Sequence, residues 1–337
     1  MDLLNEGSRT APESNPADSI GREYATIKSA AAMCLLDHRL IVRVTGDDRV
    51  SFLHGMCSAD IKGLRPGALT PGLFLTEHAH VIADFLAYET GDGAILIEID
   101  HAAWPRTRAH LEKFLVADDV EIEEAHGLAL LDIEGPRSFE MLKTVCGGMA
   151  EMPAPLRHIA IDDLRIANLP RNGGPASTVI AQRPRLTSLM EDLQARGVGD
   201  VSAQTLDIIR IEHGIARVGV DTTEKTIALE ARLEPAISFS KGCYVGQETV
   251  ERATARGNLK KRMWGLRIGG QRIPQVGAAI LLDRHEVGHL SSVAASPALG
   301  TIGLAIVHHS AWSDGARVVI VDGTGETPAT ISDLPLR

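Results

Sequence analysis

A cysteine with unusual neighbours lies in the segment of residues 241–262, KGCYVGQETVERATARGNLKKR. Cys243 stands between a glycine and a tyrosine, and a charged stretch with helical spacing follows it. Free backbone N–H groups at a helix start and nearby cationic side chains both favour a thiolate over a thiol. With Lys241 and Arg252 as the nearby cations, we predict that Cys243 carries chemistry. The alternative is a small buried cysteine that only fills space.

The residues after this cysteine have the features of a short helix. Glu248 and Arg252 are four apart with the acid first, which is the favourable order for a helical ion pair. Gly257 is well placed to end the helix in the left-handed conformation. We therefore expect Cys243 to lie just before the first helical turn.

The composition indicates an ordinary globular chain without membrane spans. The 337 residues suffice for two or three modules, with 44% apolar and 23% charged residues. No run approaches the roughly 18 apolar residues that cross a bilayer, so we expect no membrane partner. The net charge of −10 argues against direct nucleic-acid binding, and residues 260–262 (KKR) are interpreted as a solvated connector.

Four cysteines are scattered without a CxxC pair, at positions 34, 57, 146 and 243. This pattern is not a disulfide framework, and it is typical of a reducing compartment, so we expect a cytoplasmic protein. It also excludes a closely spaced zinc or iron–sulfur site contained in the chain. If Cys243 binds a metal cluster, most other ligands must come from a partner or from distant residues.

The composition and periodicity of the sequence change twice along the chain. Residues 1–22 are polar, lack periodicity and predict a disordered tail. Mixed helical and strand patterns then continue to residue 260, including the apolar run 128–133, which predicts a strand buried on both faces. Residues 261–337 contain short β runs separated by Gly, Pro and Asp turns, which is typical of a barrel or sandwich. The chain is therefore α+β with an all-β module at its end.

The sequence resembles the YgfZ/Iba57 folate-binding proteins, which are relatives of the glycine-cleavage T-protein, an aminomethyltransferase. The main carrier is the signature KGCYVGQE at residues 241–248, followed by Val250, Arg252 and Lys261-Arg262. Aminomethyltransferases lack this cysteine. Further matches are VTGD at 44–47 with FLHG at 52–55 and SAD at 58–60, EGP at 134–136, RIEHG at 210–214, and SP at 296–297 with IGLA at 302–305.

The resemblance implies a three-module ring like the aminomethyltransferase folate-binding fold. Residues 23–260 would form two intertwined α+β modules with the signature loop at 241–248, and residues 261–337 would form the C-terminal β-barrel. A folate pocket would lie at the centre, near the signature loop. The implied cofactor is tetrahydrofolate or a derivative, together with a transient iron–sulfur cluster shared with a partner.

The resemblance also suggests site residues. A pterin offers an N–H and an amino group side by side, which match the two oxygens of one carboxylate. Glu212 is the candidate, and a surface carboxylate paired with Arg210 or Arg217 is its alternative. Glu230 serves either the pocket or a structural ion pair. Three residues of the signature segment, Lys241, Gln247 and Arg252, are further candidates for folate binding.

Asp84 bears on catalysis. In aminomethyltransferases an Asp-Asp pair follows a Gly-Gly turn, and the first aspartate is catalytic. Here the matching stretch is HVIADF at residues 80–85, which keeps one acid and lacks both the glycines and the second acid. A single carboxylate can still orient a folate nitrogen or move a proton. The alternative is a strand-end residue bonded to backbone.

Three functions follow. The first is a tetrahydrofolate-binding accessory protein for assembly or repair of iron–sulfur enzymes, with Cys243 as thiolate ligand or redox-active group. Iron–sulfur carrier or client proteins are its expected partners, and in bacteria the role affects tRNA modification. The second is a tetrahydrofolate-dependent aminomethyltransferase or demethylase, with Asp84 as acid or base. The third is a partner-binding scaffold that has lost its ligand.

Overall fold

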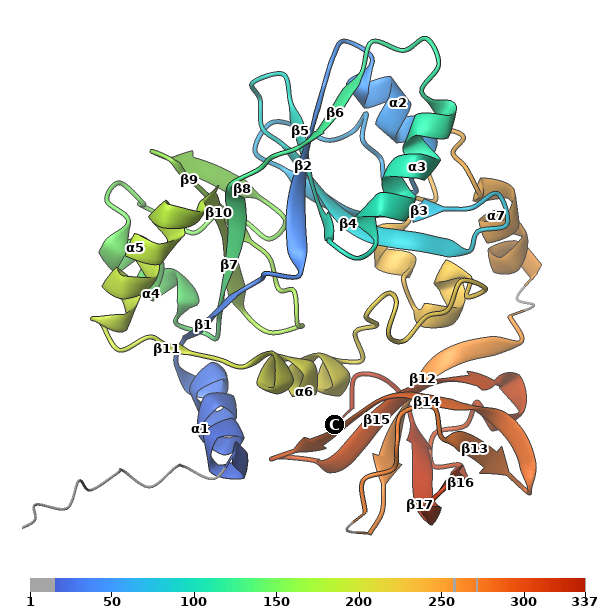
Figure 1. Cartoon of the computed structure of the whole chain (residues 1–337). Coiled ribbons are helices and arrows are strands. Elements are labelled where there is room, and N and C mark those ends of the chain that lie inside the picture. Colours follow the sequence, from blue (N-terminus) through green and yellow to red (C-terminus); the bar gives the residue numbers. More distant parts are fainter. Residues whose placement is uncertain (1–15, 257–258, 271, 337) are drawn as a thin grey trace, which may run out of the picture.

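Two β-sheets and a β-barrel surround a central helix in the computed structural model, which describes residues 16–256, 259–270 and 272–336 (Figure 1). The two sheets face each other in the larger part of the molecule. The barrel lies beside them, and the helix α6 (Ala203–His213) runs between the three units. This architecture confirms the predicted α+β ring with a C-terminal barrel.

The first sheet joins the beginning of the chain to its middle. It has six strands, and β1 pairs parallel with β11 and antiparallel with β7. The helices α4 (Ser138–Val145) and α5 (Arg183–Gln194) cover its outer face. In sheet order the strands are β11 (Gly199–Asp200), β1 (Ala32–Leu35), β7 (Leu128–Glu134), β10 (Ala176–Gln182), β9 (Leu164–Asn168) and β8 (His158–Ile161).

The second sheet is antiparallel throughout. The helices α2 (Arg49–Met56) and α3 (Trp104–Phe114) pack on its outer face, and Pro105 occupies the first turn of α3, where no backbone N–H is needed. In sheet order the strands are β3 (Leu69–Leu75), β4 (Val81–Glu89), β5 (Ile95–Asp100), β2 (Arg39–Thr45) and β6 (Glu121–Glu124).

The inner faces of the two sheets form one interface. Leu86 and Tyr88 of the second sheet share a buried cluster with Leu130 and Ile180 of the first. Leu131, on the other face of β7, packs against the helices, so β7 is buried on both sides as its apolar run predicts. The first 100 residues thus contribute strands to both sheets, and a short connection between β1 and β2 crosses from one to the other.

The N-terminal helix corrects one boundary. The predicted tail ran to residue 22, but α1 spans Pro16–Ser29, and residues 1–15 lie outside the described part. Ile20, Tyr24 and Ile27 contact a cluster that includes Leu206 of α6. These apolar residues stand three and four apart, so they share one helical face. The polar composition of residues 1–22 hid this spacing.

The barrel begins at Lys261 and closes six antiparallel strands. Closure removes exposed sheet edges and encloses a core that includes Leu266, Ile280 and Ile320. Its strands are β12 (Lys261–Ile268), β13 (Ala279–Leu282), β14 (His285–Ser296), β15 (Gly300–His308), β16 (Arg317–Asp322) and β17 (Gly325–Ser332), with a 3₁₀ turn η3 (His309–Ala311). Of the two predicted alternatives, barrel or sandwich, the barrel is correct.

A long connection links α6 to the barrel. Ser202 caps α6 by accepting a hydrogen bond from the N–H of Thr205 at 3.2 Å, and Gly214 ends the helix with a φ of 71°. Two 3₁₀ turns follow, η1 (Ala228–Ala231) and η2 (Glu234–Ala236), and then α7 (Gln247–Arg256). The backbone N–H of Leu336 bonds to the carbonyl of Glu212 at 2.8 Å, which brings the C-terminal segment back to α6.

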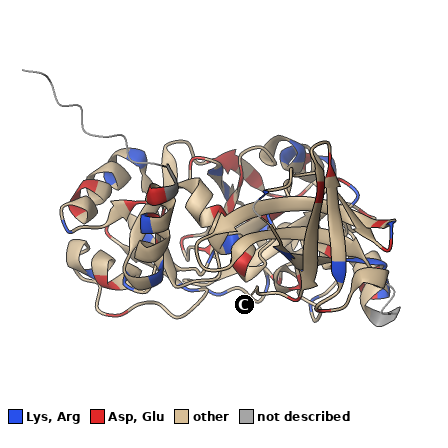
Figure 2. Cartoon of the chain, turned by 90° about the horizontal axis from the view of Figure 1, so that it is seen from below, with Lys and Arg blue, Asp and Glu red and all other residues tan. Residues whose placement is uncertain are grey.

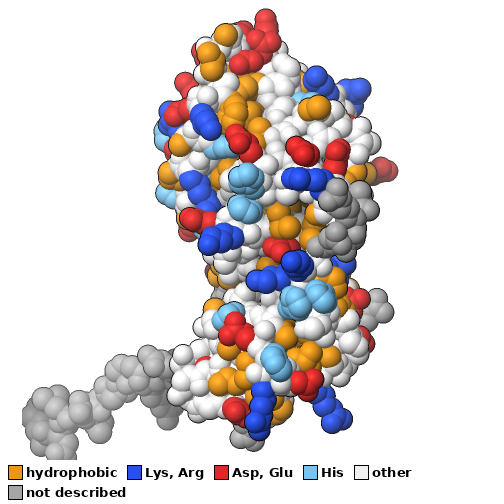
Figure 3. All heavy atoms as spheres, turned by 90° about the vertical axis from the view of Figure 1, so that its right-hand side faces the viewer, with side chains coloured by type: hydrophobic (Ala, Val, Ile, Leu, Met, Phe, Trp, Pro, Cys, Tyr) orange, Lys and Arg blue, Asp and Glu red, His pale blue; other side chains and the backbone are white. Residues whose placement is uncertain are grey.

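The surface carries interspersed charges. In the view of Figure 2, acidic and basic side chains alternate over the elements instead of separating into faces. Figure 3 shows the side of the molecule that lies to the right in Figure 1, where a narrower region joins the barrel to the larger part. In the described residues, none of the helices combines the length and apolar character that crossing a membrane requires.

Candidate functional site

A cavity of about 480 Å³ lies where the two sheets, α6 and the loop after α6 meet. Its wall alternates apolar side chains with acids and arginines, a mixture that suits an organic ligand with polar ends. The described lining residues are Cys34 to Arg39 from the β1–β2 connection, Asp84, Asp100, Arg171, Asn172, then Ala203, Leu206, Asp207 and Arg210 of α6, and Ile215 to Val218.

Asp84 is the predicted site residue that lines this cavity. Its side chain is 38% exposed, and one carboxylate oxygen lies 3.3 Å from Nη1 of Arg39. Arg39 is itself fixed, because its Nε donates to Glu98 at 3.0 Å. Asp84 therefore pairs with a side chain instead of the strand-end backbone that was the alternative. The second carboxylate oxygen remains open to a ligand.

A buried ion network supports this wall from behind. Glu98 is fully buried and receives two hydrogen bonds from Arg171, at 2.6 and 3.1 Å. Burial by itself raises the pKa of Glu98, but Arg171 and Arg39 outweigh burial and lower it to about 2. Arg171 also donates to Asp132 of β7 at 2.7 Å. The network thus ties the second sheet to the first beneath the cavity.

A second buried acid lies beside this network. Glu134 at the end of β7 is almost completely buried, and Nδ2 of Asn172 donates to it at 2.7 Å. Burial and the nearby charge of Asp132 raise the pKa of Glu134 to about 8, although the Asn172 bond acts in the opposite direction. Asn172 lines the cavity, so Glu134 is linked to the cavity wall by its hydrogen bond to the Asn172 side chain.

Glu212 lies on the side of α6 that faces α1 and the barrel. Its carboxylate accepts hydrogen bonds from Tyr24 at 2.9 Å, Ser296 at 2.5 Å and Lys28 at 3.1 Å. The exposed surface carboxylate of the alternative, paired with Arg210 or Arg217, is wrong, because Glu212 is buried and its ionic partner is Lys28. In the described lining of the cavity Glu212 does not appear.

Glu230 stabilises the turn that contains it. Its Oε2 accepts the backbone N–H of Ile227 at 3.1 Å, which caps the first residues of η1. Burial raises its pKa. The observed contact is therefore a backbone cap, whereas the sequence suggested a pocket ligand or an ion pair.

The signature loop packs against α2 on the outer side of the second sheet. Cys243 is exposed at its tip, and α7 begins four residues later. Lys241 does not point to the thiol as its cation. Its Nζ donates instead to the backbone carbonyls of His54, Cys57 and Ala59, at 2.6 Å for Cys57. These carbonyls end α2 and its following turn, where cations are favourable.

The other residues of the segment that the prediction singled out lie on α7 or next to it. The predicted helical pair is present, with Arg252 3.8 Å from Glu248 on the exposed face of α7. Gln247 donates to Glu251 at 2.6 Å on the same helix. Tyr244 and Val250 are buried against Leu73 and Leu75 of β3. None of these residues is among the described residues that line the cavity, so the loop lies outside it.

The other three cysteines lie where burial disfavours the reactive thiolate form. Burial raises the pKa of Cys57 to about 11, and burial together with Asp132 does the same for Cys34 in the cavity wall. Cys146 is also buried with a raised pKa. Among the residues that the structure describes, no group of three or more His, Cys, Asp or Glu side chains is arranged to hold a metal ion.

Several cavity residues escaped the sequence reasoning. Arg39, Arg171, Asn172, Asp207 and Arg217 stand in unrelated segments, and no spacing links them before the chain folds. The one available signal was Asp132 inside the apolar run 128–133, because a buried acid requires a cationic partner.

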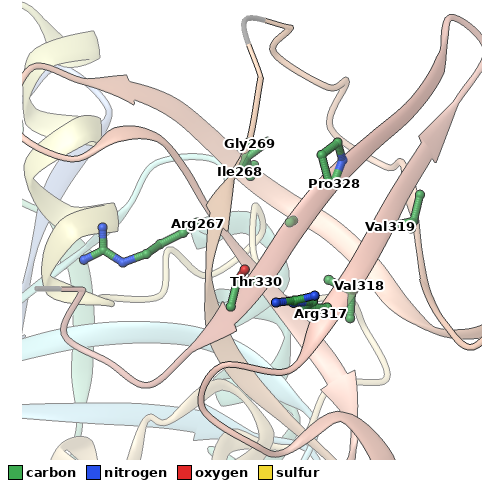
Figure 4. A pocket seen from close by; sticks show the side chains of 9 residues that line it. Arg267, Ile268, Gly269, Arg317, Val318, Val319, Pro328 and Thr330 are labelled. Carbon is green, nitrogen blue, oxygen red and sulfur yellow. The ribbon is translucent and has the colours of Figure 1, made fainter.

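A second hollow, of about 520 Å³, lies on the outside of the barrel over β12, β16 and β17 (Figure 4). Arg267 and Arg317 flank Thr330 there, and Val318, Val319 and Pro328 complete its described lining with Ile268, Gly269 and Ala329. It is shallow and open, and no acid lines it. The central cavity, with its converging acids and arginines, is the better candidate for a ligand site.

Two regions of the chain match known protein families. Residues 8–171 match the GCVT N-terminal domain, and residues 261–336 match the glycine cleavage T-protein C-terminal barrel domain. The two domains occur in this order over more than two thirds of the chain. The chain therefore carries the GCVT N-terminal domain and the T-protein C-terminal barrel domain. The match to the barrel domain begins at residue 261, where the first barrel strand β12 also begins.

The relatives are distant in sequence, but the matches cover most of each chain. An aminomethyltransferase of Rubrobacter xylanophilus is 26% identical over 323 residues, which cover 94% of this chain and 86% of that protein. A chloroplastic protein of Arabidopsis thaliana, named only as a transferase, is 28% identical over 309 residues, 89% of this chain and 70% of that protein. The crystal structure of the glycine cleavage aminomethyltransferase T from Bartonella henselae superposes with a TM-score of 0.85 at 18% identity, covering 94% and 89%.

Proposed function

We propose that this protein is a YgfZ-type member of the aminomethyltransferase superfamily that binds tetrahydrofolate, or a derivative, in the central cavity. The cavity of about 480 Å³ is within the usual range of roughly 300–1,000 Å³ for small-molecule sites. Leu206, Ile215 and Val218 offer apolar surface for the aromatic part of a folate, and acids at one side offer acceptors for a pterin. The superfamily's folate-binding fold supports the same ligand.

Asp84 is the residue that we assign to the pterin. One of its oxygens pairs with Arg39, and the partly exposed carboxylate lines the cavity. An ionised carboxylate accepts two parallel N–H bonds, so it can orient the pterin edge or hold a proton near a folate nitrogen. When bound, tetrahydrofolate supplies nitrogens that carry a one-carbon group. Glu212, whose oxygens are already bonded to Tyr24, Ser296 and Lys28, contributes by fixing α6.

The accessory role in iron–sulfur protein assembly or repair rests on Cys243. The single observation that carries it is an exposed thiol on a loop whose backbone is held by Lys241 and by close packing at Gly246, outside the folate cavity. Such a thiol can meet a second protein. Because the described chain holds no metal-ligand group of its own, a cluster would be cargo, with Cys243 as one ligand and a carrier or client protein supplying the others.

Separate variants test the two parts of this proposal. Asp84→Asn should weaken tetrahydrofolate binding in calorimetric titration, and it should leave the exposure of Cys243 unchanged. Cys243→Ser should abolish support of an iron–sulfur enzyme, or of tRNA methylthiolation, in cells that lack the native chain, while folate binding persists. Full support by Cys243→Ser would exclude the thiol from the function. Absence of tetrahydrofolate binding by folded wild-type protein would favour the partner-binding scaffold.

Aminomethyl transfer to tetrahydrofolate is the second candidate, because Asp84 lines the cavity in a family of aminomethyltransferases. In this reaction Asp84 would orient the folate or move a proton. Formation of methylenetetrahydrofolate from an aminomethyl donor by wild-type protein, and not by Asp84→Asn, would establish it. The exposed position of Cys243, away from that cavity, favours the accessory role.

A further inference from the structure

The arginines that line the central cavity differ in how they are engaged. Arg39 pairs with Glu98 and Asp84, and Arg171 pairs with Glu98 and Asp132. Arg210 pairs with Asp207 and Asp221. In the part of the chain that the structure describes, Arg217 is the lining arginine whose guanidinium has no hydrogen-bond or ion-pair partner, and it is exposed.

The backbone at Arg217 is nevertheless fixed. Its N–H donates to Oδ2 of Asp221 at 2.9 Å, and its carbonyl accepts the N–H of Asp221 at 2.8 Å. Asp221 is buried and bonded to Arg210 at 2.7 Å and to Ser292 at 2.6 Å. A cation without a partner thus stands on a loop held by a buried acid, an arrangement that preorganises it for an anionic group.

Arg217 and the β1–β2 connection line the same cavity. Burial lowers the pKa of His38 in that connection, and the nearby positive charge of Arg217 lowers it further. Leu206, Ile215 and Val218 also line the cavity. A ligand with an aromatic body and a terminal carboxylate would match an apolar wall followed by a free guanidinium.

We propose that Arg217 binds the glutamate tail of the folate and makes the cavity selective for pteroylglutamates over the tail-less pteroate. This assignment rests on the proposed function, because it assumes that the pterin end lies toward Asp84. A guanidinium presents two parallel N–H donors to a carboxylate, so the recognition depends on the shape of the group as well as on its charge.

Calorimetric titration with two ligands tests this assignment. Wild-type protein should bind tetrahydrofolate about tenfold more tightly than tetrahydropteroate, and Arg217→Gln should bind both with the affinity that wild type shows for tetrahydropteroate. Arg317→Gln, an exposed arginine on the barrel, is the matched control and should keep the tenfold preference. Arg217→Lys should retain part of it through charge alone.

The outcomes separate the two proposals. If Arg217→Gln keeps the full preference for tetrahydrofolate, the assignment of Arg217 is wrong while the folate site stands. If Arg217→Gln weakens both ligands equally, Arg217 acts on the cavity wall and not on the tail, which also overturns the assignment. If wild-type protein binds neither ligand, the folate site itself is wrong, and this inference falls with it.

Discussion

The Nζ atom of Lys241 lies 2.6 Å from the backbone carbonyl oxygen of Cys57, 184 positions earlier in the chain. The same ammonium donates to the carbonyls of His54 and Ala59, and it stands 4.8 Å from the centre of the Tyr244 ring. One side chain of the signature therefore fastens the Cys243 loop to the end of α2. Lys241 therefore positions the loop that carries Cys243, and its positive charge contacts backbone carbonyls and not the thiol.

Removal of this ammonium should loosen the loop. Lys241→Met leaves three carbonyls without their donor, and we expect a loss of about 2 kcal/mol in the free energy of unfolding. Chemical denaturation measures it. Lys62→Met, an exposed neighbour beside the same turn, is the control and should change the free energy by less than about 0.5 kcal/mol. Equal stability of the two variants would show that the Lys241 contacts are not stabilising.

Gly246 allows the loop to approach the β3–β4 turn closely. Its φ is +90°, and a Cβ at this position would lie 2.7 Å from the carbonyl oxygen of Thr76. Gly246→Ala should therefore destabilise the protein by roughly 2–4 kcal/mol through strain and backbone displacement. Gly55 in α2 is the matched control, because a Cβ there meets nothing within 4 Å and alanine favours helix.

Thermal melting of the two glycine variants distinguishes these effects. The midpoint of Gly246→Ala should fall by several degrees, and that of Gly55→Ala should stay or rise. A fall of similar size in both variants would mean that the neighbourhood of α2, and not the close approach at Gly246, determines the stability of the loop.

The sequence predicts the helices and strands better than it predicts the tertiary contacts between them. The buried strand β7 and the ion pair Glu248–Arg252 depend on residues close in the chain, and both are found as expected. Local spacing determines such features. The tail boundary failed because α1 is stabilised by its contact with α6, almost 200 residues away.

The site is less predictable for the same reason. Arg39, Arg171 and Arg217 meet the cavity from three separate segments, and only the packing of the two sheets brings them there. The charge of Lys241 was visible in the sequence, but its direction was not, since its partners are backbone carbonyls of another motif. Residue types identify candidate site residues in the sequence. Which of their side chains contact one another depends on tertiary packing.

Cys243 should be the one rapidly reactive thiol. Burial raises the pKa of Cys34 and Cys57 to about 11, so their thiolate fraction near pH 7.5 is about 100-fold below that of an ordinary cysteine. Cys243 is exposed. Brief maleimide treatment followed by mass spectrometry should show one label at Cys243, and four after unfolding. Rapid labelling that persists in Cys243→Ser would contradict this order.

Glu134 should make stability depend on pH in a specific direction. Its pKa is about 8 in the folded protein and 4.5 ordinarily, so the folded state holds a proton that the unfolded state has lost between these values. The contribution of Glu134 is present below pH 4.5 and is lost as the pH rises toward 8. Glu134→Gln keeps an oxygen for Asn172 and removes the charge. It should match wild type near pH 5 and exceed it by roughly 2–4 kcal/mol at pH 8.5.

Urea denaturation of both proteins at pH 5, 7 and 8.5 measures this difference directly, because other titrating groups are common to both and cancel. Glu191→Gln, an exposed acid on α5, is the control and should show the same difference from wild type at every pH. A constant offset for Glu134→Gln across the three values would mean that Glu134 is ionised in the folded protein. The buried proton of the pair would then lie on Asp132, whose pKa burial raises although Arg171 acts in the opposite direction.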